Sequence, residues 1–200
     1  MKHIIILLLG IITSSSIFAQ QSYETKADSI IRLMSLDEKI GQLNQITGFQ
    51  MATGPITDSG DKRKLIKEGK IGSMLNVCGE YATRSMQELA MQSRLHIPLL
   101  FGLDVIHGYR TVFPIPLAMA SSFDTEAIWQ SCRVSARESV VSGIHWTFSP
   151  MLDVARDPRW GRTPETYGED PHLTGTLGCA FVKGLQGNHP KYLKAVDIYD

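Results

Sequence analysis

I-P-L-L-F-G-L-D-V-I-H-G, residues 97–108, joins an apolar run to a polar end. The run through Leu103 is typical of a buried strand, and Asp104 and His107 follow it at once. A carboxylate and an imidazole are costly to bury there unless they have partners. Because the ligand sites of parallel α/β folds lie at the carboxyl ends of strands, this stretch indicates an α/β protein with a site at Asp104.

Predicted helices and strands alternate on both sides of this stretch. Helices are expected at residues 27–33, 35–45, 83–94, 124–141 and 173–185. Strands are expected at residues 71–77, 97–103 and 144–149, with a further strand near 192–198. Residues 48–62 and 105–123 are expected to be irregular. This alternation favours a parallel α/β sheet.

Three of the predicted helices carry a capping signal. Ser35 and Glu38 have the spacing of a capping box, and Thr83 and Asp124 are predicted N-caps. These polar residues set the predicted starts of their helices.

A charged segment, R-D-P-R-W-G-R-T-P-E-T-Y-G-E-D at residues 156–170, follows the strand predicted at 144–149. Seven of its fifteen residues are charged, and its prolines and glycines exclude a regular helix or strand. Its guanidinium, carboxylate and aromatic groups suit a rigid polar pocket, in which Trp160 and Tyr167 provide stacking surfaces. The alternative is an ion-paired surface loop. If the strands are parallel neighbours, this segment and Asp104 lie on one face.

The motifs of the chain resemble those of glycoside hydrolase family 3, and within it the periplasmic β-glucosidases. The similarity runs from about Tyr23 to Gln186, and its most specific part is R-D-P-R-W-G-R-x-x-E-x-x-G-E-D. The matching stretches are L-D-E-K-I-G-Q-L (Leu36 to Leu43), L-F-G-L-D-V-I-H-G (Leu100 to Gly108), R-T-V-F-P-I-P-L-A-M-A-S-S-F (Arg110 to Phe123), S-P-M-L-D-V-A-R-D-P-R-W-G-R (Ser149 to Arg162) and E-T-Y-G-E-D-P (Glu165 to Pro171).

The resemblance implies a particular α/β fold. An open doubly wound sheet and the first half of a (β/α)8 barrel look alike at the level of predicted elements, and the family resemblance favours the barrel. A complete barrel has eight strands in roughly 250 residues. Residues 20–200 are therefore expected to form a truncated N-terminal part of a TIM-like (β/α)8 barrel. An open sheet edge, an uncovered apolar face and a missing C-terminal part of the enzyme are the expected consequences.

The family's chemistry implies a retaining β-glucosidase that removes terminal non-reducing β-D-glucosyl residues. The expected substrates are β-linked gluco-oligosaccharides or aryl glucosides, with no cofactor. By resemblance, Asp104 and Arg162 bind hydroxyls of the non-reducing glucosyl unit. The nucleophilic aspartate and the acid/base glutamate are expected beyond residue 200, and Lys194 to Asp200 stand where the family has a lysine–histidine pair. The isolated chain is therefore expected to be inactive.

Alternatives remain open for the site and the substrate. Asp104 could cap the next turn, and the chain could be a non-catalytic sugar-binding remnant. A β-xyloside is the alternative substrate, although pentoside-cleaving members tend to carry glutamate at the position of Asp104. His107 is interpreted as a positioning residue beneath the loop. The residues of the charged segment that are expected to pair with one another are Arg156, Arg159, Glu165 and Glu169.

Composition argues against several classes of partner. Twenty basic residues balance twenty acidic ones, and no basic cluster suggests nucleic acid. No histidine or cysteine spacing indicates a metal site, and no G-x-G-x-x-G follows a predicted strand, which argues against a dinucleotide. Cys78, Cys132 and Cys179 are interpreted as buried thiols, with one disulfide as the alternative.

Residues 1–19 have the pattern of a signal peptide. Lys2 precedes the nine-residue apolar run Ile4 to Ile12, and Ala19 is a small residue before a polar start. The run is half the length of about 20 residues that a spanning helix needs, so no membrane span is expected. The mature chain is predicted to be periplasmic or secreted after cleavage near Ala19.

Overall fold

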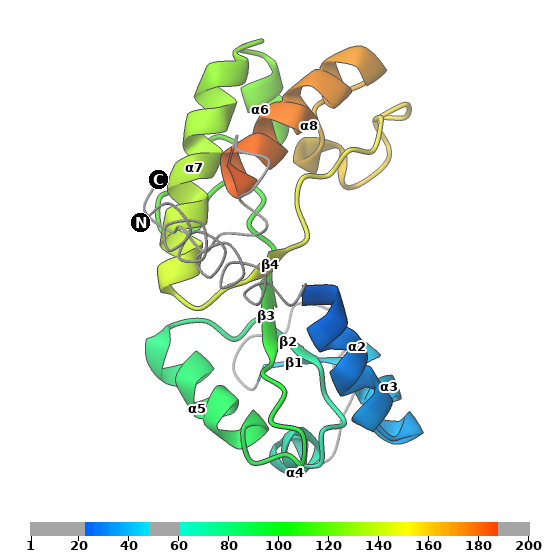
Figure 1. Ribbon diagram of the computed structural model, residues 1–200. Helices are drawn as coiled ribbons and strands as arrows, with labels where there is room; N and C mark the ends of the chain where they lie inside the picture. Colours follow the sequence, from blue (N-terminus) through cyan, green and yellow to red (C-terminus); the bar gives the residue numbers. More distant parts are fainter. Residues whose placement is uncertain (1–22, 49–60, 188–200) are drawn as a thin grey trace, which may run out of the picture.

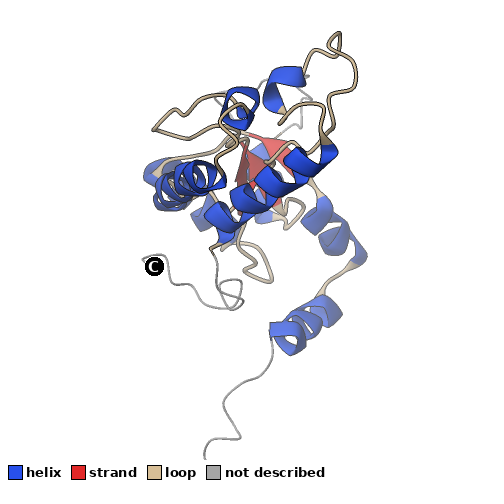
Figure 2. Ribbon diagram, turned by 90° about the horizontal axis from the view of Figure 1, so that it is seen from above, coloured by secondary structure: helices blue, strands red, loops and turns tan. Residues whose placement is uncertain are grey.

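The computed structural model describes residues 23–48 and 61–187 of the 200-residue chain (Figure 1). The predicted signal peptide, most of the predicted loop at 48–62, the strand predicted near 192–198 and the segment Lys194 to Asp200 lie outside the described residues. Within the described ranges, the chain forms one four-stranded parallel sheet with helices beside it (Figure 2).

The sheet consists of β1 (Gln45–Thr47), β2 (Ser73–Leu75), β3 (Leu100–Leu103) and β4 (Trp146–Thr147). All neighbouring pairs are parallel, and the order of the strands in space is their order in the chain. A doubly wound sheet reverses its strand order at a switch point, whereas successive strands of a barrel lie side by side. The predicted parallel α/β sheet is confirmed, and its order is that of the first strands of a barrel.

The prediction missed β1 and made the other strands too long. The sequence predicts one helix over 35–45, but α3 (Leu36–Leu43) ends before Asn44, whose ψ of 122° is extended. The Asn44 carbonyl accepts hydrogen bonds from the N–H groups of Gly72 at 3.1 Å and Ser73 at 3.3 Å. Pairing with the chain that enters β2 therefore ends the helix and starts a strand.

Two of the three predicted N-caps are confirmed. Ser35 Oγ accepts from the Glu38 N–H at 3.2 Å, and a Glu38 carboxylate oxygen accepts from the Ser35 N–H at 2.8 Å, which completes the capping box of α3. The Asp124 carboxylate accepts two N–H groups in the first turn of α7 (Thr125–Val141). The other predicted helices are also present, as α2 (Tyr23–Leu33), α5 (Glu80–Ala90) and α8 (Pro171–Gln186).

Thr83 is not a cap, because α5 (Glu80–Ala90) begins before it. The Thr83 hydroxyl instead donates to the carbonyl of Gly79, one turn back, at 3.0 Å. Two short helices, α4 (Lys62–Lys67) and α6 (Pro116–Ala120), are not predicted at all. Both are about one and a half turns long, and a segment of that length shows little periodicity in its sequence.

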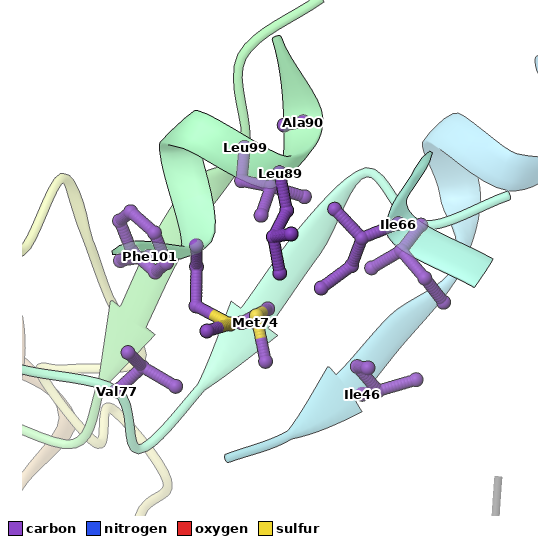
Figure 3. Close-up of a cluster of buried hydrophobic side chains, with 10 residues drawn as sticks. Ile46, Ile66, Met74, Val77, Leu89, Ala90, Leu99 and Phe101 are labelled. Carbon is purple, nitrogen blue, oxygen red and sulfur yellow. The ribbon is translucent and has the colours of Figure 1, made fainter. Parts of the chain in front are cut away.

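One face of the sheet packs against α4 and α5 (Figure 3). Ile46, Met74 and Phe101 form a paired row across β1, β2 and β3, and the side chains of Met74 and Phe101 are 0% exposed. Ile66 of α4 and Leu89 of α5 cover this row. The packing fixes β3 and therefore the position of the residues that follow it.

A second apolar core joins α6, α7 and α8, which form one group of helices in Figure 1. Ile128 and Cys132 of α7 pack with Leu177 and Phe181 of α8, and all four side chains are buried. Tyr167 of the charged segment belongs to the same core. The charged segment is therefore anchored to these helices near its C-terminal end.

The other face of the sheet is partly open. Leu100 and Gly102 flank Phe101 on β3 and therefore point away from the helices that cover Phe101. Leu100 is 52% exposed, and Trp146, which pairs with Gly102, is 44% exposed. The Trp146 ring lies 4.6 Å from the ring of Phe148. Ser73, which pairs with Leu100, is 6% exposed, so the predicted uncovered apolar face is found only in part.

Candidate functional site

Asp104 lies directly after β3, and its side chain is exposed. The next residue, Val105, is buried and donates its N–H to Thr147 Oγ1 at 3.2 Å, which ties the chain after Asp104 to β4. Among the described residues, no backbone N–H donates to the Asp104 carboxylate. The interpretation of Asp104 as a turn cap therefore gains no support.

Arg162 lies in the charged segment, immediately before the short 3-10 helix η1 (Thr163–Glu165). Its Nε donates to both carboxylate oxygens of Glu165 at 3.1 Å, and its Nη2 donates to one of them at 2.7 Å. The same Nη2 lies 3.5 Å from Met151 Sδ. A fork of this kind fixes the plane of the guanidinium as well as its position.

The charges around Arg162 relate it to Asp104. The pKa of Arg162 is raised above its ordinary value, chiefly by the hydrogen bonds and charge of Glu165 and to a smaller extent by the carboxylates of Asp153 and Asp104. Asp104 follows β3, and the segment that holds Arg162 follows β4, which is the parallel neighbour of β3. The two predicted binding residues thus follow the carboxyl ends of neighbouring strands.

Asp153 is a member of this charge group that the sequence analysis did not single out. It lies a few residues after β4, in the matching stretch S-P-M-L-D-V-A-R. Unlike Asp104, which follows β3 directly, Asp153 is separated from the end of β4 by other residues, so the strand end alone did not point to it. The sugar-binding roles of Asp104 and Arg162 stay predictions at this point.

The ion pairs of the charged segment differ from those predicted. Arg159 pairs with Asp157 at 2.6 Å, and the hydrogen bonds of this pair lower the pKa of Asp157. Glu165 pairs with Arg162. The prediction that Arg159 and Glu165 pair within the set of Arg156, Arg159, Glu165 and Glu169 is therefore wrong. In this segment, the turns of the chain place the two residues of each ion pair only two or three positions apart in the sequence.

The two aromatic rings of the segment have different environments. Trp160 is 36% exposed and presents a ring surface to solvent. Tyr167 is 2% exposed, and burial raises the pKa of its hydroxyl. The prediction of Tyr167 as a stacking surface in a pocket is wrong, because its ring is part of the core between α7 and α8.

His107 has an environment that fits a positioning role. Its Nδ1 lies 3.0 Å from the carbonyl oxygen of Phe113, and the Phe113 N–H donates to the His107 carbonyl at 2.8 Å. An isolated antiparallel bridge between Gly108 and Val112 lies inside this pair. These contacts close the chain after Asp104 into a narrow loop.

The cysteines are free thiols, and only one of them is buried. Burial raises the pKa of the Cys132 thiol to about 12, whereas Cys78 and Cys179 are exposed. The interpretation as buried thiols is therefore correct for Cys132 alone. The described ranges contain no group of three or more His, Cys, Asp or Glu side chains placed to hold a metal ion. None of the helices in those ranges has the length and apolar character needed to cross a membrane.

The fold is that of the first part of an α/β barrel, and comparison with known proteins gives the family. Residues 35–196 match the family model described as Glycosyl hydrolase family 3 N terminal domain. This match covers most of the chain, so the chain belongs to glycosyl hydrolase family 3. The resemblance inferred from the motifs is confirmed.

Individual relatives agree with this family. The periplasmic β-glucosidase of Salmonella typhimurium is 46% identical over 162 residues, which are 80% of this chain and 20% of the relative. A crystal structure of the β-glucosidase from Listeria innocua in complex with isofagomine matches with a TM-score of 0.77 and 45% identity, over 84% of this chain and 23% of that one. A β-xylosidase from Formosa agariphila is 39% identical over 111 residues, covering 50% of this chain and 15% of its own. The chain thus spans less than a quarter of the length of these relatives.

Proposed function

We propose that this chain forms the glycosyl-binding part of a retaining β-glucosidase that removes terminal non-reducing β-D-glucosyl residues. The observation that carries the proposal is the exposed Asp104 carboxylate at the end of β3, together with the Arg162 guanidinium that Glu165 orients in the segment after the neighbouring strand β4. Membership of glycosyl hydrolase family 3 and the β-glucosidase relatives support it. The substrates are β-linked gluco-oligosaccharides or aryl glucosides.

The two side chains have complementary roles toward one sugar ring. The ionised Asp104 accepts hydrogen bonds from sugar hydroxyls, and Arg162 donates to hydroxyl oxygens. Glu165 accepts hydrogen bonds from the Nε and Nη2 groups of Arg162, so we expect the two N–H donors of Nη1 to be the ones that bind the ligand. A glucosyl unit held by opposite charges in this way is fixed in both position and orientation.

The proposal assigns binding to this segment and leaves bond cleavage to other groups. In a retaining glycosidase one carboxylate attacks the anomeric carbon and a second carboxyl group protonates the leaving oxygen. Asp104 and Arg162 fill neither role. Their contribution is to place the anomeric carbon for the attacking carboxylate, which we expect beyond residue 200.

A β-xyloside is the second candidate substrate, and the Formosa agariphila β-xylosidase supports it. Xylose lacks the hydroxymethyl group of glucose. The side chain of Asp104 is one methylene shorter than that of glutamate, so it leaves more room for that group. The aspartate therefore favours the glucoside.

The proposal can be tested in a hybrid enzyme, in which residues 35–187 of this chain replace the matching segment of the Salmonella β-glucosidase. We expect the hybrid to cleave p-nitrophenyl β-D-glucoside in preference to the xyloside, and proton NMR to detect β-glucose before the α-anomer. Asp104→Glu should lower kcat/KM for the glucoside about 10-fold more than for the xyloside. A folded hybrid that prefers the xyloside, or is indifferent to Asp104→Glu, would refute the glucoside assignment.

We also propose a periplasmic or secreted location, supported by the signal-peptide pattern of residues 1–19 and by the periplasmic Salmonella relative. Expression with residues 1–19 intact should yield a chain that starts near Gln20 outside the inner membrane. N-terminal sequencing of cytoplasmic and periplasmic fractions checks this expectation. An uncleaved chain confined to the cytoplasmic fraction would contradict it.

A further inference from the structure

We infer that Glu138 of α7 is a positioning residue for the candidate site, because its carboxylate fixes the loop that follows Asp104. The inference rests on the proposed function, since it gives Glu138 a role in the same sugar-binding site. Glu138 lies 34 residues after Asp104 in the chain and belongs to no motif discussed above.

The carboxylate of Glu138 accepts three hydrogen bonds from the tip of that loop. One oxygen accepts the backbone N–H groups of Arg110 and Thr111, both at 2.8 Å. The other oxygen accepts the Thr111 hydroxyl at 2.6 Å. The hydroxyl and N–H of Thr111, followed by the N–H of Arg110, lower the pKa of Glu138. Glu138 is therefore a carboxylate at neutral pH, and the bonds are charge-assisted.

The loop itself is closed, so that holding its tip orients all of it. His107 and Phe113 pair across its base, and Gly108 forms a bridge with Val112. Gly108 has a φ of 112°, and a Cβ there would lie 2.0 Å from the Thr111 carbonyl oxygen. The chain can make this close turn only with glycine.

Asp104 lies three positions before His107, the first residue of this loop, and two contacts hold the connection. The Thr147 hydroxyl of β4 accepts the N–H of Val105 next to Asp104, while Glu138 of α7 binds the tip of the loop. The direction in which the chain leaves β3 at Asp104 is thus set by both contacts. If the Glu138 contact is lost, the Val105–Thr147 hydrogen bond remains as the other of the two.

The stability of α7 gives no separate reason for a carboxylate at this position. Glu138 lies in the last turn of α7 (Thr125–Val141), where the negative end of the helix dipole disfavours an anion. Its hydrogen bonds all go to the loop and none to its own helix. The residue type is therefore explained by the loop.

The first test uses the full 200-residue chain and hydrogen–deuterium exchange. In Glu138→Ala we expect the amides of Arg110 and Thr111 to exchange about 10-fold or more faster, since they lose their acceptor. The matched control is Glu126→Ala, a carboxylate at the other end of α7, which should leave these amides unchanged. Unchanged exchange in Glu138→Ala would overturn the inference.

The second test measures function in the hybrid enzyme. Glu138→Ala should lower kcat/KM for p-nitrophenyl β-D-glucoside about 10- to 100-fold, because small displacements of a binding group have effects of that size. Glu138→Gln should recover most of this loss, because its amide can still accept the two N–H groups and donate to the Thr111 hydroxyl. Combined with Asp104→Ala, Glu138→Ala should add little, since both changes remove the same contact.

The outcomes separate this inference from the proposed function. If Asp104→Ala itself leaves kcat/KM unchanged, the proposed function fails. If Asp104→Ala lowers kcat/KM but Glu138→Ala does not, or if the two losses multiply fully, only the positioning role of Glu138 fails. Should Glu138→Ala not fold, Thr111→Val removes the hydroxyl bond alone. A several-fold loss in kcat/KM from Thr111→Val then supports the inference, and no loss overturns it.

Discussion

Phe101 and Leu100 are neighbours on β3 that point to opposite faces of the sheet, and truncating each should have very different effects on stability. Phe101 is 0% exposed and lies 5.8 Å from the ring of His145. Phe101→Ala removes a filled position in a closed core, which typically destabilises a protein by about 3–5 kcal/mol. Leu100 is 52% exposed. Full burial of a leucine contributes about 1.5–3 kcal/mol, so Leu100→Ala should destabilise the chain by about 1 kcal/mol or less.

Urea unfolding of the purified 200-residue chain, followed by circular dichroism and tryptophan fluorescence, measures both free energies. The expected gap between the two variants is about 2–4 kcal/mol, a large part of the total stability of about 5–15 kcal/mol for an ordinary domain. The slope of the unfolding free energy against urea concentration should be the same for both variants and the parent, so that the midpoints of unfolding can be compared. Equal losses, or a larger loss for Leu100→Ala, would refute the assignment of the two faces.

The hybrid enzyme extends this prediction to the barrel. If the open face of the sheet becomes the barrel interior, Leu100 is buried there, and Leu100→Ala should destabilise the hybrid by about 2–5 kcal/mol. The difference between the destabilisation caused by Leu100→Ala in the hybrid and in the isolated chain measures how far the sheet closes around Leu100. A value that stays near 1 kcal/mol in the hybrid would contradict the barrel interpretation of this face.

Three further predictions concern other parts of the chain. Gly72→Ala should destabilise the chain by about 1–3 kcal/mol in urea unfolding, because the new Cβ would lie 2.2 Å from the Gln42 carbonyl oxygen. In Gly79→Ala the new Cβ would have nothing within 4 Å, so the loss of stability should come only from the strain of the positive φ. The pKa of Glu38 is lowered from 4.5 to about 2, chiefly by hydrogen bonds from Arg94. The ionised form therefore stabilises the fold fully above pH 4.5, and this contribution is lost as the pH falls to about 2. Glu38→Gln should therefore flatten the acid side of a plot of melting temperature against pH. If the acid side is the same in the variant and the parent, the Glu38–Arg94 pair does not cause the loss of stability in acid. The 200-residue chain alone should release no nitrophenol from aryl β-glucosides and should bind a hydrophobic dye at its open face, and clear turnover after removal of contaminating glucosidases would contradict the expected place of the catalytic groups.

The sequence was sufficient for features that depend on local chemistry. Asp124 caps α7 and Ser35 with Glu38 caps α3 because a carboxylate or hydroxyl there meets the first N–H groups of the helix in any context. The apolar run before Asp104 predicted β3 because burial on the sheet requires such residues. The family motifs then added the barrel.

Features that depend on contacts between distant residues escaped prediction. β1 exists because Asn44 pairs with the chain near Gly72, and nothing in residues 45–47 alone separates them from the preceding helix. Tyr167 stands among charged residues in the sequence, yet its ring enters the core between two helices. In the sequence, Glu138 is an ordinary polar residue near a helix end. Its role depends on the loop that it binds, and only the structure places that loop beside it.

The measurement that tests the central claim most directly is the steady-state kinetics of Asp104→Ala in the hybrid, with its melting temperature. If Asp104 binds sugar hydroxyls, kcat/KM for p-nitrophenyl β-D-glucoside should fall by the equivalent of about 2–4 kcal/mol with a raised KM, the effect of losing charged hydrogen bonds in a desolvated site. The melting temperature should hardly change, because the side chain is exposed and fills no core position. A variant that unfolds while its surviving fraction keeps normal kinetics would show that Asp104 is structural and that the site does not bind sugar through it.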